Sequence, residues 1–216
     1  MIEYFSSLGF FGWAEILAMI TGFFYVFLEI KKSHYLWYFC MVSSVFNIIV
    51  FWHNHYLAML ILQFFYIGNS FYGLAQFRKV KAAAIAQHGE RDEKDPYKVA
   101  IMPFNWKVGG IAITLAAIAF LILAPILNRY SLANGTASFP GQPYFDTFIA
   151  VVSMLNTFFL SRSYICQWYI WIILDLLTLT IFFISGMYWM ALLYVSYVAI
   201  SIYGARFWHK HGVYVR

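Results

Sequence analysis

Seven apolar stretches, each about as long as a membrane-spanning helix, limit how this chain folds more than any other feature. A bilayer core about 30 Å thick is crossed by roughly 20 apolar residues in helical conformation. By that measure the predicted spans are 10–30, 36–53, 56–77, 106–127, 144–161, 165–185 and 187–208. The runs are continuous rather than alternating, which favours helices over the strands of a barrel. The sequence therefore predicts an all-α membrane protein.

The composition supports this class and excludes others. Charged residues make up 11% of the 216 residues and hydrophobic residues 63%. A soluble domain has roughly a quarter of its residues charged, because its surface faces water. A soluble enzyme, a nucleic-acid-binding protein and a disordered chain are excluded as the main class. Membrane lipid is the expected surrounding, and no nucleic-acid partner is expected.

The distribution of basic residues predicts the orientation in the membrane. Lys and Arg collect in the loops on the cytoplasmic side. Thirteen of the fourteen lie at one set of span ends, and only Arg129 lies at the other. This asymmetry predicts an N-terminus outside and a C-terminus inside, as an odd number of spans requires.

An internal repeat relates the first three spans to the last three. Shifting the chain by 131 residues, without a gap, aligns eleven identical residues over positions 21–79. Trp37 then meets Trp168, and Gly73 meets Gly204. The predicted arrangement is 3+1+3, with bundles at 10–78 and 144–209, a cytoplasmic linker at 79–105 and a linker helix at 106–127. Because one helix separates the triplets, both run in the same direction, and such parallel repeats place a substrate between them.

Polar side chains inside the spans mark the predicted site, because they are costly in lipid and usually face a bundle interior or a wet cavity. In the sixth span Trp171, Asp175 and Thr178 share one helical face. Asp175 is the only acidic residue deep inside a span, because Glu15 and Glu29 lie nearer helix ends. A structural hydrogen bond to a neighbouring helix is the alternative role of Asp175. At the repeat offset, Ser44 and Asn47 occupy the positions of Asp175 and Thr178.

The third, fifth and seventh spans add further polar positions. These are Gln63, Tyr66, Asn69, Asn156, Tyr194 and Tyr197. For the tyrosines, ligand contact and helix packing remain open, and Gln63 and Asn47 also suit bonds between helices. Gly22, Gly73 and Gly204 favour close helix packing.

Sequence motifs for other chemistries are missing. There is no GxxxxGK[ST] motif for ATP, and no Ser-His-Asp or HExxH arrangement. His53 and His55 lie in a turn with no evident third metal ligand, and Cys40 and Cys166 form no CxxC motif. The sequence therefore predicts no enzyme activity, no metal and no cofactor.

Several segments resemble the PnuC vitamin transporters. They are Leu62–Tyr66, Tyr72–Phe77, Gln167–Asp175, Gly186–Tyr188 and Ala191–Tyr194, together with the basic turn Lys31–Lys32 that leads to Trp37. The resemblance covers nearly the whole chain and is densest in its last 55 residues. One departure is Phe77, where the family usually has Trp.

The resemblance implies facilitated uptake of nicotinamide riboside across the bacterial inner membrane by a homotrimer with a fold like that of SWEET and SemiSWEET sugar transporters. Related vitamins such as thiamine or riboflavin, a sugar, and a non-transporting receptor or scaffold are the alternatives. Trp171 suits the pyridinium cation, because an aromatic face holds a cation. The candidate substrate-binding residues are Trp171, Asp175, Thr178, Asn47, Ser44, Gln63, Tyr66, Asn69, Asn156, Tyr188, Tyr194 and Tyr197.

Overall fold

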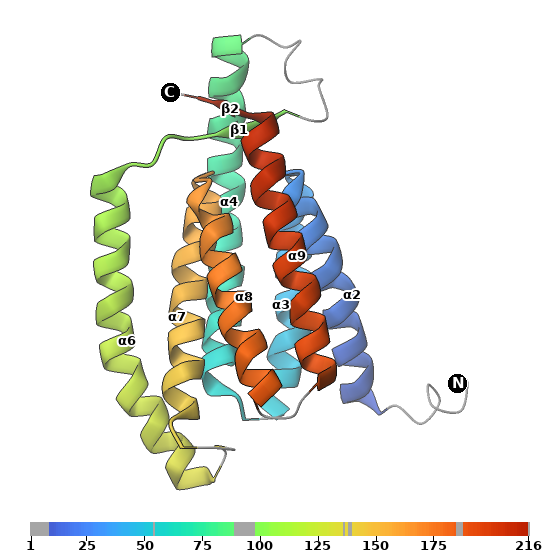
Figure 1. Ribbon diagram of the computed structural model, residues 1–216, viewed down its shortest axis with the longest axis vertical. Coiled ribbons are helices and arrows are strands. Elements are labelled where there is room, and N and C mark those ends of the chain that lie inside the picture. The colour runs from blue at the N-terminus through green and yellow to red at the C-terminus, as the bar shows by residue number, and fades with distance from the viewer. Residues whose placement is uncertain are drawn as a thin grey trace. The chain divides into compact units, whose positions relative to one another are not determined.

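The computed structural model describes residues 9–53, 55–88, 98–135, 137, 140–184 and 188–215. Within them lie seven helices (Figure 1): α2 (Phe10–Ile30), α3 (Tyr35–His53), α4 (Leu57–His88), α6 (Trp106–Asn134), α7 (Gln142–Ser161), α8 (Cys166–Ile184) and α9 (Tyr188–His211). Each predicted span coincides with one of these helices, so the prediction of seven helices is confirmed.

Five of the described helices, α2, α3, α4, α6 and α7, are long and apolar enough to cross a membrane. Residues Cys166–Thr180 of α8 form a shorter apolar helix. Helix α9 is less apolar, since its last turn holds His209, Lys210 and His211. Length and hydropathy thus single out five helices as membrane spans.

Two helices continue well past their predicted ends. Helix α4 ends at His88 instead of residue 77, and α6 ends at Asn134 instead of residue 127. Hydropathy marks where a chain leaves the lipid, whereas a helix ends where its backbone stops forming i to i−4 hydrogen bonds. The polar extension of α4 contains Ala82, Ala83 and Ala84, and alanine is the strongest helix former.

A short parallel ladder is an addition to the all-α prediction. Strand β1 (Val99–Ile101) pairs with β2 (Gly212–Tyr214), and Val215 N donates a further bond to Ile101 O at 2.9 Å. Val99, Ile101 and Val215 are each at most 2% exposed. A strand of three residues is too short to show the alternation of apolar and polar residues that marks a strand. The two strands are also far apart in the sequence, so the apolar pattern did not predict them.

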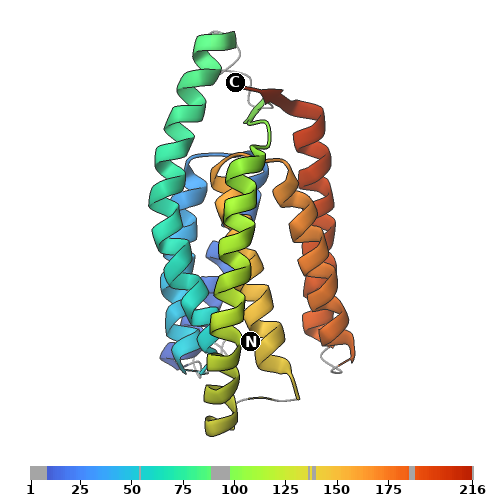
Figure 2. The ribbon, with the colours of Figure 1, turned by 90° about the vertical axis from the view of Figure 1, so that its left-hand side faces the viewer.

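The chain divides into two compact units. The N-terminal unit comprises Met1–Leu74 and Trp106–Leu155, and the C-terminal unit comprises Ala75–Asn105 and Asn156–Arg216. In the first, α2 packs against α3, while Ala58, Leu62, Leu127 and Ala150 form a core shared by α4, α6 and α7. In the second, α8 packs against α9, and both views show them as neighbouring helices (Figure 2).

The α2–α3 turn and the α7–α8 turn have the same backbone hydrogen bonds. Lys32 N donates to Glu29 O, and Ser163 N, 131 residues later, donates to Leu160 O. Three further bonds of the α2–α3 turn recur at the same offset in the α7–α8 turn. Lys32 and Ser163 also share the left-handed conformation, with φ of 47° and 62°. Two turns of different sequence thus adopt one geometry.

Each unit also has one close contact between a tryptophan and a glycine. A Cβ added to Gly73 would lie 2.5 Å from Cη2 of Trp37, and one added to Gly204 would lie 2.5 Å from Cη2 of Trp168. Both indoles are 1% exposed. Because only glycine leaves room for the ring, these two positions hold α4 against α3 and α9 against α8.

The β1–β2 ladder provides a test of local stability. Ile101 is 2% exposed, so Ile101→Val removes a buried methyl group and is expected to cost about 0.5–1.5 kcal/mol. The unfolding midpoint of the purified protein should fall. Ile111→Val is the matched control, because Ile111 is 63% exposed on α6. Equal midpoints for the two variants would contradict a stabilising ladder.

Candidate functional site

The predicted substrate-binding residues divide between the two units. Ser44, Asn47, Gln63, Tyr66 and Asn69 belong to the N-terminal unit. Trp171, Asp175, Thr178, Asn156, Tyr188, Tyr194 and Tyr197 belong to the C-terminal unit. Tyr188 is the first residue of α9, and its side chain lies outside the described part of the chain. Each half of the predicted site is therefore described separately.

Asp175 is the centre of the cluster in the C-terminal unit. The Ser201 hydroxyl of α9 donates a 2.8 Å hydrogen bond to Asp175 Oδ2 on α8. Asp175 is partly buried, and a carboxylate inside a membrane helix is stable only when paired, hydrogen-bonded or hydrated. Ser201 supplies one hydrogen bond, which leaves other acceptor positions of the carboxylate for a ligand. The bond also joins α8 to α9, which is the structural role that sequence analysis kept open.

Aromatic rings lie beside this carboxylate. Tyr194 and Tyr197 interact electrostatically with Asp175, and their rings meet edge to face with centroids 5.4 Å apart. Trp171 lies one turn before Asp175 on the same face of α8. A carboxylate next to electron-rich rings attracts a cation, because both the charge and the ring faces are negative.

Thr178 and Asn156 are less available to a ligand than predicted. Thr178 Oγ1 donates a 2.9 Å bond to Leu174 O within its own helix. Asn156 Nδ2 donates to Gln167 O at 3.0 Å. Gln167 and Asp175 are eight residues apart on α8, which is about 12 Å along the axis. Asn156 therefore belongs to a second polar group, away from Asp175.

This second polar group is fully buried. Asn156 and Gln167 are both 0% exposed. Among the described residues, Asn156 Oδ1 and both polar atoms of the Gln167 amide have no hydrogen-bond partner. An unpaired buried amide costs free energy, so these atoms are candidates for an ordered water or a ligand. Gln167 was not among the predicted site residues, although it is a polar residue next to Trp168 at the start of α8.

In the N-terminal unit, Asn47 joins neighbouring helices. Asn47 Nδ2 donates to Ser43 O at 3.0 Å and to Ser43 Oγ at 3.2 Å. Ser43 Oγ in turn donates to Ala18 O on α2 at 3.3 Å. The amide nitrogen of Asn47 is thus part of a hydrogen-bonded chain between α3 and α2. This is the bonding role that the sequence left open as an alternative to ligand binding.

The remaining predicted residues of this unit lie on α3 and α4. Ser44 is 1% exposed, Gln63 6% and Asn69 7%. The Cys40 thiol forms hydrogen bonds with Ser44 and Ser70. Ser44 and Ser70 correspond, at the 131-residue offset, to Asp175 and Ser201. The same two positions are thus close together in each unit, but only the C-terminal unit has a carboxylate there.

A buried carboxylate near the end of α2 was not among the predicted site residues. Glu29 is 2% exposed and forms a side-chain hydrogen bond with Tyr25, which also lies near Cys40 and Tyr66. Tyr25 and Glu29 are four residues apart and so share a helical face. That spacing was the signal for this pair, which adds a second acidic group to the interior of the protein.

The neighbouring turn holds a buried lysine. Lys32 follows α2 and is 8% exposed. Burial lowers its pKa to about 7, because an ammonium group is poorly solvated away from water. Lys31, next to it, is exposed and lies 4.8 Å from the centroid of the Phe27 ring. At neutral pH, the Lys32 ammonium group is therefore in equilibrium with the neutral amine.

Comparison with known proteins identifies the family. The family model described as nicotinamide mononucleotide transporter matches residues 12–210. The chain belongs to the nicotinamide mononucleotide transporter family. This places it among membrane transporters, which agrees with the apolar helices and with the resemblance found in the sequence.

Individual members of the family are distant in sequence. The nicotinamide riboside transporter PnuC of Escherichia coli (strain K12) is 21% identical over 211 residues, covering 91% of this chain and 84% of that protein. The riboflavin/roseoflavin transporter RibM of Streptomyces davaonensis is also 21% identical, over 198 residues, with the same coverage. A crystal structure of the vitamin B3 transporter PnuC superposes with a TM-score of 0.61 at 18% identity, covering 92% of this chain and 81% of that one. This similarity supports a shared helical fold.

Proposed function

We propose that this protein mediates facilitated uptake of nicotinamide riboside across a bacterial inner membrane. The Asp175 cluster is the observation that carries the proposal. A carboxylate bonded to Ser201, with Tyr194 and Tyr197 beside it and Trp171 one turn away, suits a ligand with a pyridinium cation and hydroxyl groups. The relatives named as nicotinamide riboside and vitamin B3 transporters support the same substrate.

The architecture that we propose is a 3+1+3 repeat related to the SWEET and SemiSWEET transporters, with the N-terminus outside and the C-terminus inside. The turns at Lys32 and Ser163 have hydrogen bonds at equivalent positions, which supports the repeat. The contacts of Trp37 with Gly73 and of Trp168 with Gly204 support it as well. The substrate would bind between the two triplets, and rocking of one triplet against the other would carry it across. A homotrimer is the proposed assembly.

An unphosphorylated substrate fits the charge distribution better than a nucleotide does. Lys and Arg lie at the ends of the apolar segments, not at their centres. A phosphate group is usually held by Arg, Lys or a helix N-terminus. We therefore propose the riboside as the substrate, although the family's description names the mononucleotide.

A flavin is the second candidate, because RibM matches the chain as extensively as the riboside transporter does. The two ligands differ in charge, since riboflavin has no pyridinium cation. Asp175→Asn is expected to weaken binding of a cationic ligand far more than binding of a neutral flavin. A thermal-shift panel of nicotinamide riboside, thiamine, riboflavin and sugars would rank the candidates, because ligands that bind the native state raise its unfolding midpoint.

Liposome transport tests the proposal directly. Purified protein in liposomes is expected to equilibrate nicotinamide riboside across the bilayer, with no accumulation above the outside concentration and no effect of a protonophore. Equilibration of riboflavin alone would favour the second candidate. Binding of the riboside without any movement would instead indicate a receptor or scaffold and would overturn the transport proposal.

A further inference from the structure

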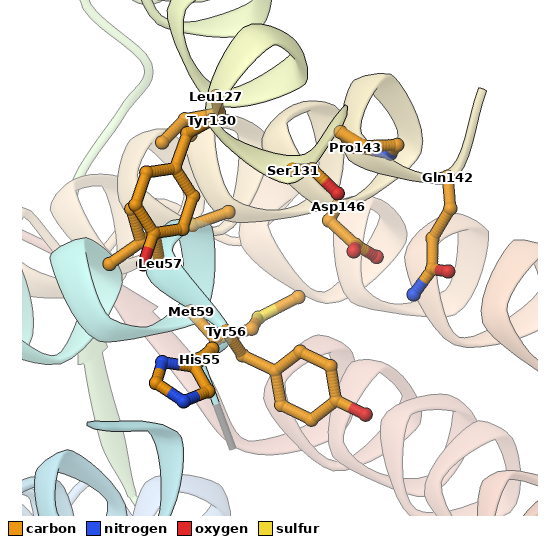
Figure 3. Close-up of a pocket in the computed structure, with 11 residues that line it drawn as sticks. His55, Tyr56, Leu57, Met59, Leu127, Tyr130, Ser131, Gln142, Pro143 and Asp146 are labelled. Carbon is orange, nitrogen blue, oxygen red and sulfur yellow. The ribbon is translucent and has the colours of Figure 1, made fainter. Parts of the chain in front are cut away.

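A pocket in the N-terminal unit lies apart from the predicted substrate-binding residues, none of which lines it. It opens to the outside of the unit, and the space in it that a water-sized molecule can reach is about 40 Å³. Ends of several helices meet there: the α3–α4 turn, the start of α4, the last turns of α6 and the start of α7 (Figure 3). Because this space is well below the roughly 300–1,000 Å³ typical of pockets that enclose a whole ligand, the pocket suits a small group at one end of a ligand. The orientation proposed above places it on the outer side of the membrane.

One wall of the pocket is acidic and polar. Asp146 and Gln142 of α7 extend into the space, and Ser131 of α6 lies beside them (Figure 3). The Gln142 amide forms a hydrogen bond with the Asp146 carboxylate. Among the eleven described residues that line the pocket, none is Lys or Arg, so no basic side chain of the lining balances this carboxylate.

Aromatic rings form the rim on the other sides. Tyr130 comes from α6, while His55 and Tyr56 come from the α3–α4 turn (Figure 3). His55 adopts a left-handed conformation with φ of 58°, and Tyr56 N closes the turn with a 3.0 Å bond to Phe51 O. Such a conformation is uncommon for a residue other than glycine. The tight turn holds the Tyr56 ring at the mouth of the pocket.

The repeat provides an independent observation on the acidic position. Asp146 corresponds to Glu15 at the 131-residue offset, so the first helix of each triplet has an acidic residue near its beginning. Nine acidic residues occur in the whole chain. Two of them therefore occupy equivalent positions in the repeat, near the end of each triplet that we assign to the outside.

We infer that this pocket is a second binding site, which takes a small organic cation. The Asp146 carboxylate balances the positive charge. The rings of Tyr56 and Tyr130 line the same pocket, and aromatic rings bind pyridinium and ammonium groups. Leu57, Ala58 and Leu127 contact the apolar part of the ligand. Two sources supply such a cation: a soluble pyridinium or ammonium compound, or the ammonium headgroup of a phospholipid. The inference does not depend on which solute the protein transports.

Binding of a soluble pyridinium tests the first source. The probe is radiolabelled N-methylnicotinamide, measured by equilibrium dialysis with the full-length protein in phosphatidylglycerol nanodiscs. All variants carry Asp175→Asn, so that binding of the probe at the Asp175 cluster is weakened and binding at the pocket can be measured by itself. We expect saturable binding of N-methylnicotinamide, and neutral nicotinamide should not displace it. Adding Asp146→Asn should weaken it at least fivefold, and adding Tyr56→Leu should also weaken it.

Lipid composition tests the second source. If the occupant is a headgroup, nanodiscs containing phosphatidylethanolamine should raise the unfolding midpoint of the protein above that in phosphatidylglycerol alone. Asp146→Asn should abolish this difference, and N-methylnicotinamide would then show little binding because the site is filled.

Tyr144→Leu is the matched control for Tyr56→Leu, since both tyrosines are 44% exposed and Tyr144 does not line the pocket. The control should behave like the parent protein in both arms. If Asp146→Asn and Tyr56→Leu also match the parent in both arms, the inference is overturned. Liposome uptake of nicotinamide riboside is scored separately, so failure of this site leaves the transport proposal standing.

Discussion

Gly204→Leu is expected to destabilise the C-terminal unit by about 3 kcal/mol or more, at the upper end of the cost of overfilling a packed interior. Even a single added Cβ would lie 2.5 Å from Cη2 of Trp168, which is closer than real Cβ contacts come. Trp168 is 1% exposed and meets the Trp208 ring edge to face, so its indole has little room to move. The readout is the yield of monodisperse protein and its unfolding midpoint.

A second-site change distinguishes a steric clash from a general effect of replacing glycine in a helix. Trp168→Ala in the Gly204→Leu background makes room for the leucine, and part of the lost midpoint should return. Gly68→Leu is the control, because a Cβ at Gly68 has no described neighbour within 4 Å. Gly68 lies inside α4, where a better helix former should be neutral or stabilising. Equal losses at positions 68 and 204 would contradict the packing argument.

Asp175→Ala is expected to weaken binding of nicotinamide riboside tenfold or more, which corresponds to at least about 1.4 kcal/mol. The substitution removes the carboxylate that lies beside Tyr194 and Tyr197. Calorimetric titration of the purified protein measures the change. Asp175→Asn retains the side-chain shape and an acceptor for Ser201, so it isolates the loss of charge from the loss of packing.

Two further variants make this result specific. Ser201→Ala removes the 2.8 Å bond to Asp175 and leaves the carboxylate, so a smaller loss of affinity is expected. Thr180→Ala, on the exposed face of the same helix, should leave the affinity unchanged. If Asp175→Ala and Thr180→Ala bind the riboside equally, Asp175 has no part in recognition, and its role is the structural bond to α9.

The sequence was most informative about the helices, because lipid imposes long apolar runs that are visible without any structure. The starts of α2 and α6 were predicted to the residue, since an apolar run begins where the chain enters the membrane. The ends of α4 and α6 were misplaced, because a helix continues into water wherever its backbone bonds persist. The β1–β2 ladder was missed, since each strand has three residues and its partner is far away in the chain.

The candidate site was predicted less evenly. Helical spacing placed Trp171 and Asp175 on one face, but it gave no information on the Ser201 bond, which depends on how α9 packs. Asn47 was chosen for its polarity, yet its amide nitrogen bonds to Ser43. Glu29 was set aside for lying near a helix end, although it is 2% exposed. Polarity within a span predicts that a side chain needs a partner, and only the packing determines whether that partner is a helix or a ligand.

The parallel ladder has a consequence for biosynthesis. Strand β1 (Val99–Ile101) leaves the ribosome before α6, α7, α8 and α9, and its hydrogen-bonding partner β2 (Gly212–Tyr214) follows all of them. The apolar side chains of Val99 and Ile101 therefore stay uncovered while four helices are made and inserted. A nascent chain arrested before residue 212 should expose this segment to added protease, and the segment should become resistant once translation passes β2.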